Sequence, residues 1–276
     1  MINNIKDCTV LHNGVKMPWF GLGVYKVEDG KEVIHSVHKA IEVGYRGIDT
    51  AALYQNEMGV GQAVKESGVP REELFITTKV WNDRQGYEST LQAFEESRKK
   101  LGLDVVDLYL IHWPVKGKYL ETWRALEKLY RDGYVKAIGV SNFQVHHLKD
   151  IIDNFEIKPM VNQVEFHPRL TQREVLTFCR ENQIQLEAWA PLMRGRLMDH
   201  PTIVKLAKKY GKKPAQIILR WDLDSEVVTI PKSVHAERIV ENANIFDFQL
   251  EKSDIEEINA LNENERTGAD PDNFSF

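Results

Sequence analysis

Residues 44–57, GYRGIDTAALYQNE, join a short apolar run to a polar loop, and the rest of the chain repeats this pattern. The apolar run ends at Asp49, and Tyr54 follows five residues later. The next strand-like run, LFITTK, ends at Lys79, and the following one, VVDLYLIH, ends at His112. If these runs are neighbouring parallel strands, the four side chains meet at one end of the sheet.

Eight short apolar runs alternate with longer amphipathic stretches. Residues 119–133 place apolar side chains at three- and four-residue spacing and end at Gly133, which is typical of a helix, and residues 89–101 and 171–179 show the same spacing. Strict β–α alternation implies parallel strands with right-handed crossovers. Eight such units in about 250 residues favour an α/β fold of the closed (β/α)8 TIM barrel type over an open sheet. The runs are WFGLG, YRGID, LFITTK, VDLYLIH, VKAIGVS, VNQVE, IQLEAW and VVTIP.

The two ends of the chain differ from this pattern. Residues 9–18, TVLHNGVKMP, contain Asn-Gly between two extended runs, which predicts an N-terminal β-hairpin, and we expect it to cap the bottom of the barrel. The tail after Leu261 is polar and contains Gly and Pro, so we expect it to run over the surface. No break rich in Pro, Gly and Ser divides the chain, and we expect residues 1–276 to form a single barrel domain.

The composition argues against several classes of function. Lys and Arg number 36 and Asp and Glu 41, and the net charge of −5 gives no electrostatic reason to expect nucleic acid or an anionic membrane. Cys8 and Cys179 lie far apart and predict neither a disulfide framework nor a zinc site. The sequence shows no metal-ligand cluster, no signal-peptide core and no 18-residue apolar stretch, so we expect a cytoplasmic protein.

Asp, Lys, Tyr and His together can donate a proton to a carbonyl oxygen. A phenol with a pKa of about 10 is a weak acid at neutral pH, but a nearby ammonium lowers that pKa. We therefore expect Lys79 to activate Tyr54 while Asp49 keeps the lysine charged. Tyr54 would protonate the oxygen as it becomes an alkoxide, and His112 would orient it. Singly, each residue is more often structural, but the joint pattern at successive strand ends indicates catalysis.

The segment after the eighth run predicts a phosphate site. Residues 230–250, IPKSVHAERIVENANIFDFQL, place Lys232, Ser233 and Arg238 at a loop and a helix start. Cations, a hydroxyl and a helix N-terminus suit a phosphate group, although an ordinary solvated helix is the alternative interpretation. No Gly-rich GxGxxG follows a strand, so a Rossmann site is not indicated.

These strings resemble the aldo-keto reductases in order and spacing from about Val10 to about Leu261. The resemblance implies a (β/α)8 barrel and reversible, NADPH-dependent reduction of aldehydes and ketones to alcohols, with Tyr54 as the proton donor. It assigns Lys232, Ser233 and Arg238 to the 2′-phosphate of NADPH. The other implied cofactor ligands are Glu241 and Asn242 for the adenine, Ser141, Asn142 and Gln163 for the nicotinamide carboxamide, and Trp189 for stacking on the nicotinamide.

One segment departs from the family pattern. After Trp189 the chain reads Ala190, Pro191 and Leu192, where the family commonly has Ser-Pro-Leu. Pro191 and Leu192 match the cofactor-binding segment, but Ala190 lacks the hydroxyl that would touch the pyrophosphate. We therefore expect backbone contact there and modestly weaker cofactor binding.

Three aromatic residues near the strand ends, Tyr25, Trp81 and Trp113, are expected to form the substrate pocket together with His112. A short loop after His112 and a short tail predict an open, shallow pocket. We therefore expect broad specificity for small reactive carbonyls such as methylglyoxal and glyoxal. In size and sequence the chain is similar to the bacterial glyoxal and diketogluconate reductases of the family.

Two other interpretations remain open from the sequence. The chain could be a cofactor-binding regulatory subunit of a larger assembly without significant turnover, because fold alone does not set function. It could also be another barrel enzyme, an isomerase or aldolase, with Lys79 as a Schiff base. The intact set of four residues favours the reductase, which we expect to be a monomer.

Overall fold

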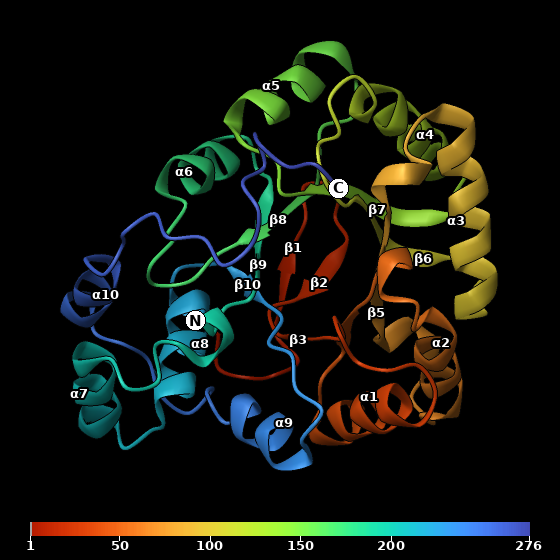
Figure 1. Ribbon diagram of the computed structural model, residues 1–276. Helices are drawn as coiled ribbons and strands as arrows, with labels where there is room; N and C mark the ends of the chain where they lie inside the picture. The colour runs from red at the N-terminus through yellow and green to blue at the C-terminus, as the bar shows by residue number, and fades with distance from the viewer. Residues whose placement is uncertain (1) are drawn as a thin grey trace.

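The computed structural model describes residues 2–276, and it confirms the predicted alternation of strands and helices (Figure 1). Eight parallel strands form one sheet in the order β10-β9-β8-β7-β6-β5-β4-β3. The two edges of this sheet meet, because Phe20 forms a parallel bridge with Thr229 and Gly23 one with Lys232. The sheet therefore closes into the expected barrel. Its strands are β3 (Gly21–Gly23), β4 (Gly47–Asp49), β5 (Phe75–Val80), β6 (Val106–Ile111), β7 (Val135–Ser141), β8 (Val161–Glu165), β9 (Gln185–Trp189) and β10 (Val228–Thr229).

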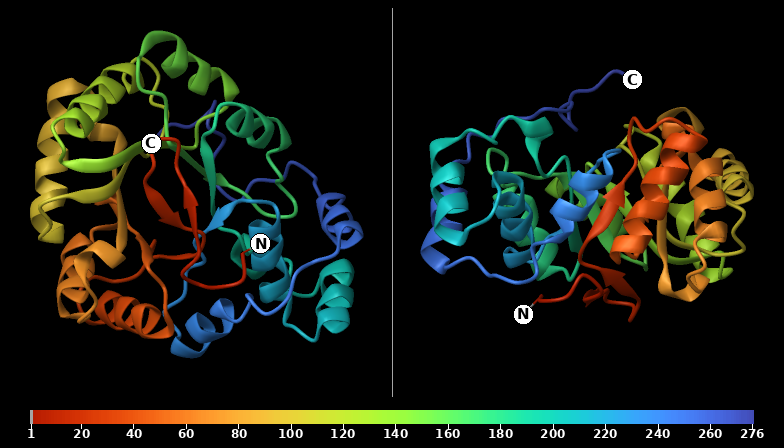
Figure 2. Two further views of the ribbon diagram at one scale, coloured as in Figure 1. Left: turned by 180° about the vertical axis from the view of Figure 1, so that it is seen from behind. Right: turned by 90° about the horizontal axis from the view of Figure 1, so that it is seen from below.

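Ten α-helices surround the barrel in the described part of the chain (Figure 2). The helices predicted over 119–133, 89–101 and 171–179 correspond to α4, α3 and α6, with ends shifted by at most two residues. The helices are α1 (Lys31–Val43), α2 (Glu57–Glu66), α3 (Tyr87–Leu101), α4 (Tyr119–Arg131), α5 (Val145–Asn154), α6 (Arg173–Glu181), α7 (Pro201–Tyr210), α8 (Pro214–Asp224), α9 (Ala236–Ala243) and α10 (Lys252–Asn259). Short 3-10 turns are η1 (Ala52–Tyr54), η2 (Arg71–Glu73), η3 (Asn82–Arg84) and η4 (Met193–Gly195).

The first residue of the opening segment explains why the chain turns from helix α1 into strand β4. Gly44 has a φ of 115°, and its N–H bonds to the carbonyl oxygens of Ala40 and Ile41. A residue in this left-handed conformation ends a helix, and glycine adopts it without steric cost. The chain then runs through Gly47 into the buried strand that delivers Asp49.

The predicted hairpin is formed by β1 (Cys8–Val10) and β2 (Lys16–Pro18), which pair antiparallel with Cys8 opposite Pro18. In the turn, Gly14 has a φ of 88°. Met17 and Pro18 line a small cavity with Gly21, Gly47 and Phe75 at the starts of the first strands. The hairpin therefore caps the bottom of the barrel, on the face opposite the C-terminal tail (Figure 2).

Residues 262–276 run over the surface of the protein, as expected, and they do so across the top of the barrel (Figure 2). The backbone N–H groups of Thr267 and Gly268 donate to the buried Glu165 carboxylate, at 2.6 and 3.1 Å. Further on, Phe274 packs against Trp113 with ring centroids 5.2 Å apart. A buried acceptor thus fixes the tail over the strand ends.

Candidate active site

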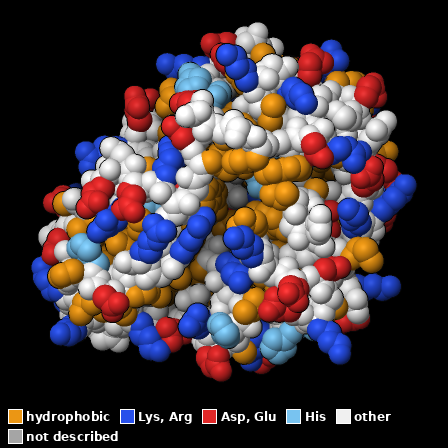
Figure 3. All heavy atoms as spheres, in the orientation of Figure 1, with side chains coloured by type: hydrophobic (Ala, Val, Ile, Leu, Met, Phe, Trp, Pro, Cys, Tyr) orange, Lys and Arg blue, Asp and Glu red, His pale blue; other side chains and the backbone are white. Residues whose placement is uncertain are grey.

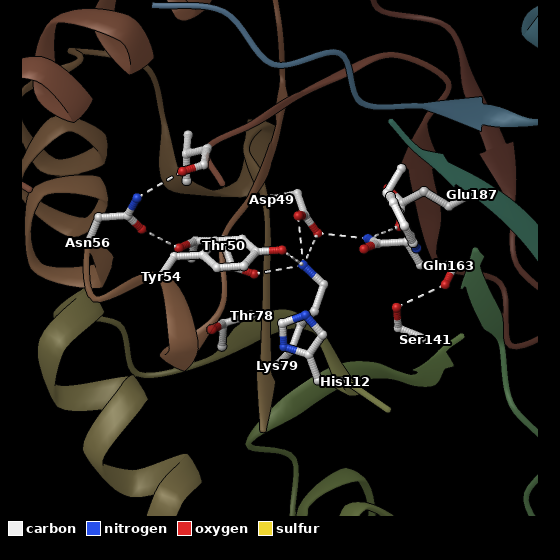
Figure 4. Close-up of polar contacts among 12 residues, drawn as sticks. Asp49, Thr50, Tyr54, Asn56, Thr78, Lys79, His112, Ser141, Gln163 and Glu187 are labelled. Carbon is white, nitrogen blue, oxygen red and sulfur yellow. Dashed lines mark hydrogen bonds and ion pairs between the residues drawn. The ribbon is translucent and has the colours of Figure 1, made fainter. Parts of the chain in front are cut away.

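The four predicted residues meet at the top of the barrel (Figure 4). The Lys79 ammonium donates to both carboxylate oxygens of Asp49, at 2.8 and 2.7 Å, and to the carbonyl of Thr50, at 3.0 Å. Its third partner is the Tyr54 hydroxyl, at 3.5 Å. The His112 ring lies beside this group, with its centroid 5.7 Å from that of Tyr54. These distances arise from the parallel register, in which Asp49, Lys79 and His112 follow one another at the ends of β4, β5 and β6.

The protonation states follow from burial and from the ion pair. Burial disfavours the Lys79 ammonium, but the Asp49 carboxylate outweighs this effect, and the pKa of Lys79 is raised. Burial and the Lys79 charge hold the pKa of His112 well below its usual range, so its ring is neutral at pH 7. A neutral imidazole can donate one hydrogen bond without adding a second positive charge.

The expected lowering of the Tyr54 pKa is not found. Burial raises the pKa of Tyr54 to about 12, and the opposing effect of Lys79 is smaller. Tyr54 therefore keeps its proton throughout the physiological pH range. The lysine limits the cost of forming a buried phenolate but does not make the phenol acidic in the resting site.

The loop that carries Tyr54 is fixed by a buried amide. Asn56 accepts a hydrogen bond from the Thr50 hydroxyl at 2.7 Å and donates to the carbonyl oxygens of Val24 and Val27, both at 2.9 Å. Val24 follows β3, so Asn56 joins the loops after β3 and β4. This buried polar network restricts the position of Tyr54, whose backbone N–H also bonds to Ala51 at 2.9 Å.

Aromatic side chains surround the opening, as predicted. The ring centroid of Tyr25 is 5.0 Å from that of Tyr54, and that of Trp81 is 4.9 Å from His112. The tail contributes Phe276, which stacks on Trp81 at 5.8 Å and meets Trp113 edge-on at 5.2 Å. The tail therefore supplies aromatic side chains on one side of the opening, and the open, shallow pocket stays a prediction.

The residues implied for the nicotinamide lie around the same opening. The Asn142 amide donates to the His112 carbonyl at 3.0 Å and to the Ser141 hydroxyl at 3.1 Å, and its oxygen accepts from Trp189 Nε1 at 2.8 Å. Ser141 donates to the Gln163 carbonyl at 2.9 Å. The structure thus brings Ser141, Asn142, Gln163 and Trp189 together, although the Asn142 side chain already uses its polar atoms within the protein.

The residues implied for the 2′-phosphate and the adenine lie in the turn before α9 and along this helix. Lys232 and Arg238 are exposed, and within residues 2–276 neither forms an ion pair. The Ser233 hydroxyl accepts from the backbone N–H of His235 at 3.1 Å, which fixes the turn before the helix. Glu241 pairs with Lys213, so the residue implied for adenine is already engaged, and Asn242 is buried. Figure 3 shows a hollow at the centre of this face, with Lys and Arg side chains on its rim.

The segment after Trp189 turns back from the barrel. Ala190 has a φ of 51°, an uncommon conformation for a residue with a side chain, and Pro191 is buried while Leu192 is half-buried. The segment lies directly after β9, where its backbone borders the opening. Its predicted contact with a pyrophosphate stays a prediction.

Two buried carboxyl groups near the site were not found from the sequence. Glu187, on β9, accepts a hydrogen bond from the Gln163 amide, and Glu165, at the end of β8, binds the tail. Side chains alternate between the two faces of a strand, so Glu165 in VNQVE and Glu187 in QLEAW each share a face with an inward-facing neighbour. This alternation is the sequence signal that could have identified both residues.

The comparisons with known proteins agree with this geometry. The model of the "Aldo/keto reductase family" matches residues 20–263. The chain is 62% identical over 276 residues to "Glyoxal reductase" of Bacillus subtilis (strain 168), with 100% of both chains covered. It is 50% identical over 268 residues to "Methylglyoxal reductase DkgA" of Salmonella typhimurium, covering 96% of each.

A solved structure extends the likeness to three dimensions. A mutant of Gox0644 crystallised in complex with NADPH superposes with a TM-score of 0.93 at 43% identity, and 98% of each chain is covered. The family match over most of the chain, together with relatives of this similarity, shows that the chain belongs to the aldo/keto reductase family, whose members reduce carbonyl groups with NADPH.

Proposed function

We propose that this chain reduces small aldehydes and ketones, including glyoxal and methylglyoxal, to alcohols with NADPH, and that Tyr54 donates the proton. One observation carries the assignment of roles: the Lys79 ammonium lies between the Asp49 carboxylate and the Tyr54 hydroxyl, at 2.7 and 3.5 Å. We further propose that residues 1–276 act as one unit, as a monomer in the cytoplasm. The free thiols of Cys8 and Cys179 are compatible with a reducing compartment.

The residues present fit the cofactor. Lys232 and Arg238 offer unpaired cations beside a helix N-terminus for the 2′-phosphate, and Ser233 adds a hydroxyl. Near the tetrad formed by Asp49, Tyr54, Lys79 and His112, Gln163 offers an amide and Trp189 a ring face for the nicotinamide. When bound, NADPH would supply the hydride. The protein would place the carbonyl and hold the proton.

The protein's contribution to the reaction follows from its charges. A carbonyl oxygen in the opening would accept hydrogen bonds from Tyr54 and from neutral His112, which orient it. As negative charge develops on that oxygen, the Tyr54 proton moves to it. The phenolate that remains is stabilised by the Lys79 ammonium, which is already in place and needs no reorganisation.

The aromatic walls support small carbonyls as substrates. Phe276 stacks on Trp81 and meets Trp113 edge-on, and Trp81 meets the His112 ring edge-on, so the walls beside His112 are aromatic. The named relatives act on glyoxal and methylglyoxal, which are small and uncharged. A panel of carbonyls tests this proposal by kcat/KM, and a single bulky ketone preferred by several orders of magnitude would contradict it.

The alternatives have less support. No named relative is a regulatory subunit, so a cofactor-sensing module without turnover is not favoured. A Schiff base on Lys79 needs a neutral amine, whereas this nitrogen donates to three groups and has a raised pKa.

The direct experiment follows NADPH absorbance after methylglyoxal is added to the wild type and to Tyr54→Phe. Rapid oxidation by the wild type and a loss of about a thousandfold or more in the variant would support the proposal. Tyr134→Phe, which removes an exposed hydroxyl far from the site in sequence, is the matched control and should retain turnover. Equal turnover by the wild type and Tyr54→Phe would refute the role of Tyr54.

A further inference from the structure

Gln163 connects two buried carboxyl groups beneath the tetrad. Its amide nitrogen donates to Asp49 Oδ1 and to Glu187 Oε2, both at 2.8 Å (Figure 4). Gln163 and Glu187 are direct partners in the parallel pairing of β8 with β9. The register of the barrel strands therefore places the Gln163 amide between Asp49, which belongs to the tetrad, and Glu187, which has no assigned role.

These two bonds fix the orientation of the amide. Both N–H bonds of the Gln163 amide are used, and its Oε1 accepts no hydrogen bond from residues 2–276. Turning the amide over would place its oxygen against the Asp49 carboxylate, which is electrostatically unfavourable. Oε1 is thus held as an acceptor that faces away from the carboxyl groups.

Glu187 lacks the cation that Asp49 has. The three hydrogen-bond partners of Lys79 are Asp49, Thr50 and Tyr54, so none of its N–H groups reaches Glu187. Beneath Glu187 lies a cavity of about 10 Å³, lined also by Met17, Pro18 and Val228, which leaves room for about one water at most. Glu187 is therefore a poorly hydrated carboxyl group that accepts one strong hydrogen bond, from the Gln163 amide.

We propose that Glu187 is a positioning residue for the cofactor: with Asp49 it holds the Gln163 amide so that Oε1 receives the N–H of the nicotinamide carboxamide. This inference rests on the proposed function, in which that carboxamide lies at Gln163. It assigns Glu187 a task that involves neither the substrate nor the transferred proton.

The charge of Glu187 adds a dependence on pH. Burial and the nearby Asp49 raise the pKa of Glu187 to about 8, opposed by Gln163 and Lys79. The charged groups that face it are Asp49 of β4 and Lys79 of β5, whereas β8 offers uncharged Gln163, and the hairpin and β10 offer apolar side chains. Glu187 is therefore mostly neutral at pH 7 and becomes negatively charged as the pH rises toward 9.

This charge distinguishes the two forms of the cofactor. The nicotinamide of NADP⁺ is positively charged and that of NADPH is neutral, so an ionised Glu187 favours NADP⁺. The 2′-phosphate is common to both forms, and its titration cancels in the ratio of their dissociation constants. The ratio of Kd for NADPH to Kd for NADP⁺ should rise at least about threefold from pH 7 to pH 9.

The test measures binding of both forms by calorimetry at pH 7 and pH 9, without substrate. Glu187→Leu removes the acceptor and should raise Kd for NADPH about three- to tenfold at pH 7. Glu187→Gln keeps a neutral acceptor, so it should bind NADPH within about twofold of the wild type at pH 7 but show no change of the ratio with pH. Asp222→Asn, which alters a buried carboxyl bonded to Thr229, is the matched control and should keep the wild-type change.

The outcomes separate this inference from the proposed function. Wild-type Kd values in Glu187→Leu, or an unchanged rise of the ratio in Glu187→Gln, would overturn the role of Glu187. Thermal melting shows whether Glu187→Leu is folded, and Glu187→Gln provides the test if it is not. A wild type that binds neither cofactor form would instead refute the proposed function, while tight binding without carbonyl turnover would leave the role of Glu187 measurable.

Discussion

The ammonium of Lys79 lies 2.7 and 2.8 Å from the two carboxylate oxygens of Asp49, and both groups are buried. A charge pair taken out of water is stable only while both partners are present. The Asp49 carboxylate therefore keeps the Lys79 ammonium charged beside Tyr54, and no counter-ion from solution is needed.

Asp49→Asn should remove the negative partner of Lys79. The variant leaves Lys79 buried without its anion, which costs about 3–5 kcal/mol of unfolding free energy and should lower kcat sharply. Because the pKa of Lys79 is raised in the folded protein, its stabilising contribution is complete below the unfolded pKa of about 10.5 and is lost at higher pH. Urea unfolding of both proteins at pH 7 and above pH 11 should show a smaller difference at the higher pH.

Asp132→Asn is the control for that comparison. Asp132 pairs with Lys128 at 2.7 Å, but both side chains are more than a third exposed. Loss of this exposed pair should change stability far less. Similar effects of Asp49→Asn and Asp132→Asn would contradict the importance of the buried pair.

Arg238→Ala should weaken NADPH far more than NADH. Arg238 is exposed on α9, and a bidentate contact with the 2′-phosphate is available only to NADPH. We expect the KM for NADPH to rise about tenfold to a hundredfold, with little change for NADH. Lys252→Ala removes an exposed cation from α10 and serves as the control. Equal increases for both cofactors would refute the assignment.

Glu165→Gln should release the tail. The Glu165 carboxylate accepts hydrogen bonds from Thr267 and Gly268, and although burial opposes ionisation, these bonds and that from His167 lower its pKa. Its contribution is therefore present above the unfolded pKa of about 4.3 and lost as the pH falls through the folded value. We expect a loss of about 1.5–3 kcal/mol and faster amide hydrogen exchange over residues 267–276.

The exposed Glu263, which pairs with Arg169, provides the comparison for that experiment. Glu263→Gln should leave hydrogen exchange at Thr267 and Gly268 unchanged. Unchanged exchange in Glu165→Gln as well would show that the aromatic contacts alone hold the tail.

Acidification should destabilise the wild type more than His112→Gln. The pKa of His112 is depressed by burial and by Lys79, so the unfolded state binds its proton first as the pH falls below about 6.5. Stability therefore declines by up to about 1.4 kcal/mol per pH unit in that range. Unfolding free energies at pH 7, 6 and 5 should fall less steeply in His112→Gln, and parallel slopes would contradict a buried, neutral His112.

Local pattern was sufficient to predict the barrel and the meeting of Asp49, Lys79 and His112. A buried strand ends where its run of apolar residues ends, and the carboxyl ends of parallel strands lie on one face of the barrel. The direction of the Tyr54 pKa could not be predicted in this way, because it depends on how burial compares with the lysine charge. The contacts of Glu187 and Glu165 were missed because each partner is far away in the chain, and only the register of the sheet and the path of the tail bring them together.

Gln163 and Glu165 stand two residues apart on β8, one beneath the tetrad and the other holding residues 267–268. The tail that carries Phe274 and Phe276 is therefore anchored to β8 at Glu165. These two aromatic side chains remain separate from the groups that move the proton. Substrate range and chemistry can vary independently in such an arrangement. Grafting a different sequence after Gly268 is thus a route to new carbonyl specificities that leaves the reaction centre intact.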